Sequence, residues 1–302
     1  MPSISRVREV GGITRFLAAL LVCWTVMGCD APADQTEHSE DSVSGDRIEV
    51  MDDAGRSWRF EEPPRRIVSL VPSATGILLG LGMEERLVAR TDFDRHDRLS
   101  GLPSVGGGLN PSLERLLEVR PDLVIRFEGP TDRATPGALD DLGIAHLAVR
   151  PDTIGDIRRI IGLLATVVGE PDRGSALETE LMGTLDAVRE SVADQASPRV
   201  AFLLGGDPPW VAAAGTFLDE LLQIAGAENV FGDAGPLYAP VSVEEVLRRE
   251  PDFLLAPEGA RVPGSLDRLP LRRVPESVQS PGLELGESAR ELARILHPEL
   301  LR

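Results

Sequence analysis

Lysine is absent from this 302-residue chain, so all 31 of its basic residues are arginine. The 49 acidic residues outnumber them, and the formal net charge at pH 7 is −18. No arginine-rich run offsets this charge, and a strongly acidic chain repels nucleic acid and anionic lipid. We therefore exclude nucleic-acid binding. The lack of lysine also excludes a P-loop, because that phosphate site requires one.

Cysteine and histidine are scarce, with two and four copies. The histidines are dispersed, and no Ser-His-Asp or Cys-His set stands out, so we predict no catalytic residue and no resident cofactor. A metal site is not predicted either, because structural and catalytic metal sites need clustered ligands. An enzyme on a doubly wound α/β scaffold remains a remote alternative.

The first 28 residues have the composition of a bacterial signal peptide. Arginines at positions 6, 8 and 15 precede an apolar run at residues 16–27, which is short for a membrane-spanning helix. The run ends in Val-Met-Gly-Cys at residues 26–29, which resembles a lipobox. The resemblance implies that Cys29 becomes the lipid-modified first residue of the mature protein, while Cys23 leaves with the signal peptide. The alternative is an ordinary signal peptide or a short membrane anchor in which Cys29 is incidental.

Residues 29–46 are small, polar and acidic, and they contain one large aliphatic side chain, Val43. Such a segment cannot bury enough apolar surface to offset the entropy of ordering it. We predict a flexible tether. The folded part is therefore expected outside the cytoplasm, in the periplasm or at the cell surface, and anchored to a membrane through Cys29.

The remaining chain alternates short apolar runs with amphipathic stretches, which is typical of parallel βαβ units. Strands are expected at residues 47–50, 57–60, 66–71, 87–90, 123–127, 146–149, 199–204 and 253–256. Helices are expected at residues 75–81, 113–119, 153–168, 173–195, 217–225, 244–249 and 288–296. We predict an α/β fold with two Rossmann-like lobes, residues 47–170 and 198–302, joined by a single long helix at residues 171–197. A ligand cleft is expected between the lobes.

Two segments echo one another: LERLLEVRPDLVI at residues 113–125 and VEEVLRREPDFLL at residues 243–255. Each combines a helix, a Pro-Asp pair that ends the helix and a buried strand. One copy falls in each predicted lobe. The duplication indicates pseudo-symmetric lobes.

Five phrases together resemble the class III substrate-binding proteins of ABC importers, a family that captures cobalamin, haem and ferric siderophores. They are RRIVSLVPSATGILLGLG, LPSVGGGLNPSLERLLEVRPDLVI, LLQIAGAENVF, YAPVSVEEVLRREPDFLL and ARELARILHPEL. The resemblance covers roughly residues 47–302. It implies a monomer that delivers its ligand to an ABC permease and its ATPase, with little closure of the lobes on binding. The second lobe looks short between residues 257 and 280.

The resemblance also implies a permease-docking role for one carboxylate in each lobe. The matching positions are Glu114 and Glu244, at corresponding places in the two echoed helices. Exposed charges far apart can fix orientation while keeping docking reversible. Each helix also carries a second acidic residue, Glu118 or Glu245, and both pairs are also consistent with ordinary solvated helix residues.

Ligand-binding residues are expected in loops at the strand ends, which is where open α/β sheets bind ligands. Several scarce aromatics fall in or beside these loops, and aromatic faces suit a flat macrocycle. Aromatics near residues 210 and 238 also line the pocket of cobalamin-binding family members. The predicted ligand-binding residues are Ser73, Thr75, Phe93, Phe127, Trp210 and Tyr238.

Ligand identity stays open among three classes, with a corrinoid preferred. Cobalamin-type members often have an aromatic near Gly106, and this chain has three glycines there. Several arginines could meet an anionic ferric siderophore: Arg90, Arg95 and Arg126. Haem members use Tyr or His as an axial ligand, for which Tyr238 and His96 are candidates, whereas His146 is expected to be structural.

Overall fold

The computed structural model describes residues 47–235 and 237–301. The predicted signal peptide (residues 1–28), the tether (residues 29–46) and the lipidation site Cys29 lie outside the described residues. Within the described part of the chain, no helix is both long and apolar enough to cross a bilayer.

The first lobe contains a four-stranded parallel sheet in the order β4-β3-β5-β6, preceded by an antiparallel hairpin. The hairpin strands are β1 (Ile48–Met51) and β2 (Ser57–Phe60). The sheet strands are β3 (Ile67–Ser69), β4 (Leu87–Ala89), β5 (Leu123–Phe127) and β6 (His146–Val149). Its helices are α1 (Pro72–Gly80), α2 (Leu113–Val119), α3 (Thr135–Asp141) and α4 (Ile154–Val168).

The second lobe repeats this strand order, because β9, β7, β11 and β12 form a parallel sheet in which β7 and β11 are central. Two further strands, β8 and β10, extend it in the antiparallel sense. The strands are β7 (Arg199–Gly205), β8 (Trp210–Ala212), β9 (Glu228–Asn229), β10 (Tyr238–Pro240), β11 (Phe253–Pro257) and β12 (Leu271–Val274). The helices are α6 (Phe217–Ile224), α7 (Val243–Arg248) and α8 (Leu285–Leu296).

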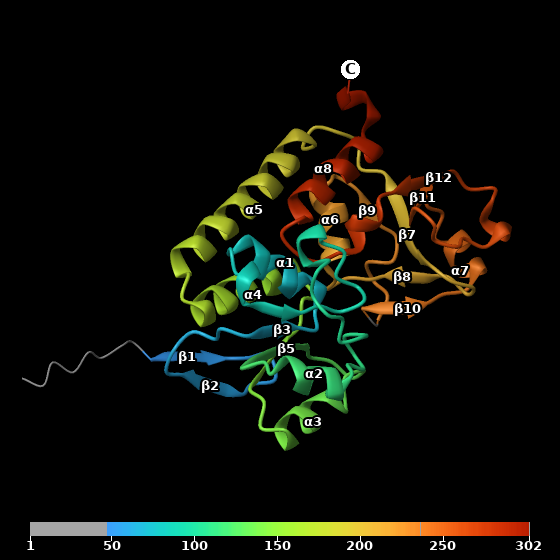
Figure 1. Ribbon diagram of the computed structural model, residues 1–302. Helices are drawn as coiled ribbons and strands as arrows, with labels where there is room; N and C mark the ends of the chain where they lie inside the picture. The colour runs from blue at the N-terminus through green and yellow to red at the C-terminus, as the bar shows by residue number, and fades with distance from the viewer. Residues whose placement is uncertain (1–46, 236, 302) are drawn as a thin grey trace, which may run out of the picture. The chain divides into compact units, whose positions relative to one another are not determined.

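One long helix, α5 (Pro171–Ser191), connects the two sheets. It packs on α4 of the first lobe and on α8 and α6 of the second (Figure 1). The largest cluster of mutually packed buried side chains includes residues of both lobes, from Ile67 in β3 to Leu296 in α8. The predicted α/β class with two lobes and a long connecting helix is confirmed.

The segment after α2 is held by a polar clamp at the start of the first sheet. The Asp122 carboxylate accepts the backbone N–H of Arg66 (2.9 Å), and the Asp122 N–H donates to the Arg66 carbonyl (2.9 Å). The Arg66 guanidinium donates to the carbonyls of Val119 (2.6 Å) and Arg120 (3.0 Å) at the end of α2. Arg120 has φ = 45°, which is uncommon for a residue other than glycine, so these bonds hold a turn that the chain does not favour by itself.

The second lobe repeats this clamp at corresponding residues. Asp252 accepts the N–H of Arg199 (2.7 Å) and donates its own N–H to the Arg199 carbonyl (2.8 Å). The Arg199 guanidinium donates to the carbonyl of Glu250 (3.1 Å), which has φ = 49°. The echo in the sequence therefore corresponds to a repeated three-dimensional unit.

Two short strands lie where loops were expected, and that expectation was wrong. Trp210 begins β8 and Tyr238 begins β10, and the two strands pair with Pro240 opposite Trp210 and Tyr238 opposite Ala212. Each strand has three residues, which is too short to show alternating polarity. Residues 205–209, which directly precede Trp210, are rich in glycine and proline, and this composition predicts a loop. The stretch of the second lobe that looked short contains β12 and two 3₁₀ turns.

Two glycines in α5 predict opposite stability changes on substitution by alanine. A Cβ at Gly174 would lie 2.4 Å from the Ala165 Cβ in α4, whereas nothing lies within 4 Å of a Cβ at the exposed Gly183. Gly183→Ala should raise the free energy of unfolding by about 0.5–1 kcal/mol through helix propensity. Gly174→Ala should lower it by about 1–3 kcal/mol through overpacking. Urea denaturation followed by circular dichroism measures both, and equal stability of the two variants would contradict the close α4–α5 contact.

Candidate functional site

A cavity of about 970 Å³ lies between loops of the first lobe and residues 276–284 of the second lobe. This volume is at the upper end of the roughly 300–1,000 Å³ that small-molecule pockets span. Its apolar wall consists of Leu70, Val71, Pro72, Phe93, Leu109, Phe127, Pro151 and Pro281. Its polar wall consists of Ser73, Asp94, Arg95, His96, Asn110, Glu276, Ser277, Gln279, Ser280 and Glu284. The cavity suits a large ligand with an extended apolar surface.

Three of the six predicted ligand-binding residues line this cavity: Ser73, Phe93 and Phe127. Phe93 is 64% exposed although it is a large apolar side chain, and it belongs to the apolar wall of the cavity. Thr75 is buried in α1, and its hydroxyl donates to the Val71 carbonyl (3.3 Å). The ligand-binding role of all six residues stays a prediction.

Trp210 and Tyr238 do not line the cavity. Trp210 is 46% exposed on β8. Tyr238 is half-buried against the main core. Burial raises the pKa of Tyr238 to about 12, and the negative charge of Asp152 contributes in the same direction. The phenol is therefore neutral at physiological pH.

The second lobe contributes its wall of the cavity through residues 276–284, which sequence reasoning missed. These residues follow β12 and lead into α8, and β12 itself was not predicted. The segment is mostly polar and carries no periodic signal, although residues 276–279 form a 3₁₀ turn. Across the cavity, the Arg95 guanidinium of the first lobe forms an ion pair with Glu276 of the second at 3.0 Å.

The three consecutive glycines form part of the first lobe's wall, since Gly107 and Gly108 line the cavity. A Cβ at Gly108 would lie 2.2 Å from the Leu70 carbonyl oxygen, so only glycine allows this backbone to approach the end of β3. Gly106 has φ = 89°, which also favours glycine. The backbone conformation therefore explains the glycines at these positions, whatever the ligand is.

His96 lines the cavity, whereas His146 is buried in β6. Burial and the neighbouring Arg126 guanidinium lower the pKa of His146, so this histidine is neutral. Arg126 itself is buried and forms an ion pair with Glu128 (2.9 Å). Within residues 47–235 and 237–301, no three His, Cys, Asp or Glu side chains are grouped to hold a metal ion.

The two predicted docking carboxylates occupy equivalent positions, because Glu114 and Glu244 are each the second residue of a short helix and both are exposed. The preceding serines cap the helices: Ser112 accepts from the Arg115 N–H (3.4 Å) and Ser242 from the Glu245 N–H (3.1 Å). Among the described residues, neither carboxylate forms an ion pair. Glu245, in contrast, is paired with Arg249 (2.7 Å) and Arg248.

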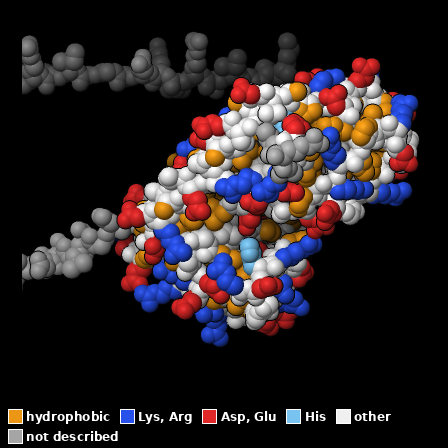
Figure 2. Space-filling model, turned by 90° about the horizontal axis from the view of Figure 1, so that it is seen from above, with side chains coloured by type: hydrophobic (Ala, Val, Ile, Leu, Met, Phe, Trp, Pro, Cys, Tyr) orange, Lys and Arg blue, Asp and Glu red, His pale blue; other side chains and the backbone are white. Residues whose placement is uncertain are grey.

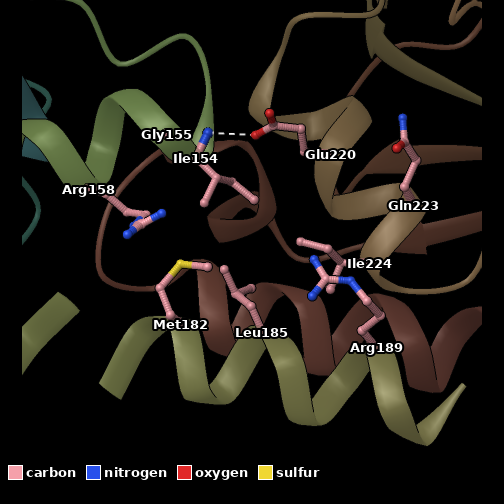
Figure 3. A pocket seen from close by; sticks show the side chains of 9 residues that line it. All are labelled: Ile154, Gly155, Arg158, Met182, Leu185, Arg189, Glu220, Gln223 and Ile224. Atoms are coloured by element: carbon pink, nitrogen blue, oxygen red, sulfur yellow. Dashed lines mark hydrogen bonds between the residues drawn. The ribbon is translucent and has the colours of Figure 1, made fainter. Parts of the chain in front are cut away.

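A second, smaller cavity of about 320 Å³ lies between α4, α5 and α6 (Figure 3). It contains none of the predicted site residues. Beside it, the Glu220 carboxylate of α6 accepts the backbone N–H of Ile154 at the start of α4 (2.6 Å). The Phe217 N–H also donates to the Asp152 carbonyl (2.6 Å). These bonds join the two lobes at a second place besides α5.

The surface mixes charges of both signs. Figure 2 shows arginine and acidic side chains interspersed over the viewed face, with hydrophobic side chains between them. Many of the arginines form exposed ion pairs, among them Arg158 with Glu178 (2.6 Å) and Arg59 with Glu49 (2.9 Å). Such pairs contribute little stability individually.

Comparison with known proteins identifies similar chains. The family model described as periplasmic binding protein matches residues 67–262. A vitamin B12-binding protein of Pectobacterium carotovorum subsp. carotovorum (strain PC1) is 28% identical over 195 residues, which cover 64% of this chain and 71% of that protein. An uncharacterized ABC transporter substrate-binding lipoprotein of Bacillus subtilis (strain 168) is 24% identical, over 94% of this chain and 97% of that one. A periplasmic haem-binding protein of Roseiflexus sp. RS-1, solved in apo form, superposes with a TM-score of 0.67 at 26% identity, over 78% of this chain and 99% of that one.

Tyr238 is the chain's single tyrosine, so its ionisation can be followed by the absorbance of tyrosinate. We expect a midpoint of about pH 12 in the native protein and about 10 after unfolding. The unfolded state then loses its proton first, so stability falls as pH rises from about 10 to 12. Asp152→Asn should lower the native midpoint without bringing it to 10, because burial is the larger cause. The exposed Asp194→Asn is the control, and a native midpoint near 10 would contradict the burial of this phenol.

Proposed function

The chain belongs to the periplasmic binding protein family, and we propose that it is the extracytoplasmic substrate-binding component of an ABC importer, which captures a corrinoid in its cleft and delivers it to the membrane permease. The proposal gives the protein no catalytic role. Its partners are the permease with its ATPase, and the binding protein acts as a monomer. Similarity to an ABC transporter substrate-binding lipoprotein along nearly the whole chain supports this role.

The observation that carries the proposal is the large cavity between the lobes, with an apolar wall that includes Phe93 and Phe127. Aromatic faces bury large apolar area against a flat ring system. The main core is continuous through both lobes, which supports a cavity whose shape is set by the fold. A preformed cavity lowers the ordering cost of binding.

A corrinoid is the preferred ligand because a relative that aligns with 64% of this chain is a vitamin B12-binding protein. The alternative is haem or a ferric siderophore. Similarity to a haem-binding protein favours this alternative. So does the presence of an imidazole, His96, in the cavity wall, since imidazole can ligate haem iron.

Permease docking is proposed for Glu114 and Glu244. Their exposure, their lack of ion-pair partners among the described residues and their equivalent positions in α2 and α7 support this role. Two separate carboxylates give an orientation that one could not, and exposed charge pairs keep the contact reversible. We also propose that a lipid anchor at Cys29, which lies outside the described residues, holds the protein near the permease.

The first test removes the aromatic wall. Phe93→Ala and Phe127→Ala should each weaken binding of cyanocobalamin about 10- to 100-fold, because each removes aromatic surface from the contact. Isothermal titration of the purified protein measures the affinity. Met51→Ala removes an exposed apolar side chain on β1, outside the cavity, and should leave the affinity unchanged. Unchanged affinity in both phenylalanine variants would place the ligand elsewhere.

The second test reverses the docking charges. Glu114→Arg combined with Glu244→Arg should abolish ligand-stimulated ATP hydrolysis by the permease complex in liposomes while ligand affinity stays unchanged. Glu118→Arg is the matched control, because it places the same charge on the exposed surface of α2. Full stimulation by the double variant would rule out these two carboxylates as the docking residues.

A further inference from the structure

The charged groups that line the large cavity are unbalanced. Three carboxylates belong to the wall, those of Asp94, Glu276 and Glu284, against one guanidinium, that of Arg95. The only other titratable lining group is the His96 imidazole. The wall therefore carries a surplus of negative charge, beyond what one arginine neutralises.

The single guanidinium is already engaged. Arg95 lies 3.0 Å from Glu276, and this pair bridges the two lobes. An anionic ligand group that approached Arg95 would share the guanidinium with Glu276, whose negative charge already offsets that of the arginine. The other arginines proposed to meet an anion, Arg90 and Arg126, do not line the cavity.

Asp94 is the buried member of the acidic set, with 6% of its surface exposed. Its Oδ2 accepts the backbone N–H (2.7 Å) and the hydroxyl (2.8 Å) of Thr91. Its Oδ1 has no hydrogen-bond donor among the described residues. Asp132 also has buried carboxylate oxygens without a donor, but only Asp94 lines the cavity. A buried carboxylate oxygen without a donor is costly, and a ligand N–H would relieve that cost.

Glu284 brings a second carboxylate from the other lobe to the same wall. A Cβ at Gly76, on α1 of the first lobe, would lie 3.7 Å from Glu284 Oε1 and 3.8 Å from His96 Nε2. The carboxylate thus reaches α1 near His96. Within the described chain, Glu284 and Asp94 form no ion pair. Glu284 is also exposed, whereas Asp94 Oδ1 is buried and lacks a donor.

We infer that the cleft selects a ligand without net negative charge that presents N–H donors at its edge, and that Asp94 and Glu284 determine this selection. The inference rests on the proposed function, because it takes the cavity as the ligand site. Corrinoids carry amide groups around the ring and match this wall. Haem carries two propionates and ferric catecholate siderophores are anionic, so both meet the surplus of carboxylates.

The experiment compares two ligands that differ in one group: cyanocobalamin and its monocarboxylic acids, in which one ring amide is hydrolysed to a carboxylate. Binding to the purified protein is measured by titration at pH 8, where an ordinary histidine is neutral. We expect cyanocobalamin to bind at least tenfold more tightly than the monocarboxylic acids, the effect of replacing a charge-assisted hydrogen bond by repulsion. In Asp94→Asn combined with Glu284→Gln, this ratio should fall towards one. Haem and ferric enterobactin are titrated in parallel.

Glu85→Gln is the control, because it neutralises an exposed carboxylate outside the cavity and should leave the ratio unchanged. Circular dichroism verifies that all variants are folded. If the protein binds cyanocobalamin with a ratio that the double variant does not change, the inference is wrong while the proposed function stands. A preference of the unmodified protein for haem or ferric enterobactin would also overturn it. If none of these ligands binds, the proposed function itself fails.

Discussion

The geometry of both lobes depends on the repeated polar clamp, which Asp122 forms with Arg66 and Asp252 forms with Arg199. In each lobe the aspartate that follows the helix pairs in both directions with the backbone of an arginine at the start of the first strand, and that arginine binds the end of the helix. The clamp holds Arg120 and Glu250 at positive φ, which costs about 1–3 kcal/mol at such residues. Several charge-assisted hydrogen bonds offset this cost. The start of each sheet and its helix thereby become one rigid piece.

The clamp links the surface that carries the exposed glutamates to the sheet whose strand ends form the cavity wall. The helix that each clamp fixes carries an exposed glutamate, while the strand that it fixes leads into the lobe's own sheet. In the first lobe that strand, β3, ends beside Leu70 in the cavity wall. Because the core is continuous through α4, α5 and α8, and because Glu220 and Phe217 tie the lobes together a second time, we expect little freedom between them. A cleft of fixed shape would recognise a ligand by complementarity of surface and charge rather than by closure.

The parts of this architecture that could be predicted from the sequence are those with a repeated or periodic signal. Long apolar strands, amphipathic helices and the duplicated Pro-Asp segment each involve many residues that agree with one another. The strands β8 and β10 have three residues each, so Trp210 and Tyr238 were assigned to loops. Residues 276–284 reach the cavity only because β12 and α8 bring them there, and no local pattern reports such a tertiary placement. Thr75 illustrates the same limit, since a position near a strand end says nothing about which way the side chain faces.

Several basic side chains of this lysine-free chain make contacts that only arginine can make. The Arg66 guanidinium donates to two carbonyls from Nε and Nη2 at once, and Arg126 binds the Phe127 carbonyl and the Glu128 carboxylate through one nitrogen while its Nε meets His146. These contacts use the planar, directional donors of arginine, which an ammonium group on a flexible stem does not reproduce. Arginines used in this way are unavailable to a ligand. The acidic excess of the chain therefore persists in the cavity wall, where Arg95 is the one guanidinium among the lining residues and Glu276 neutralises it. The charge that a ligand would meet there is that of Asp94 and Glu284.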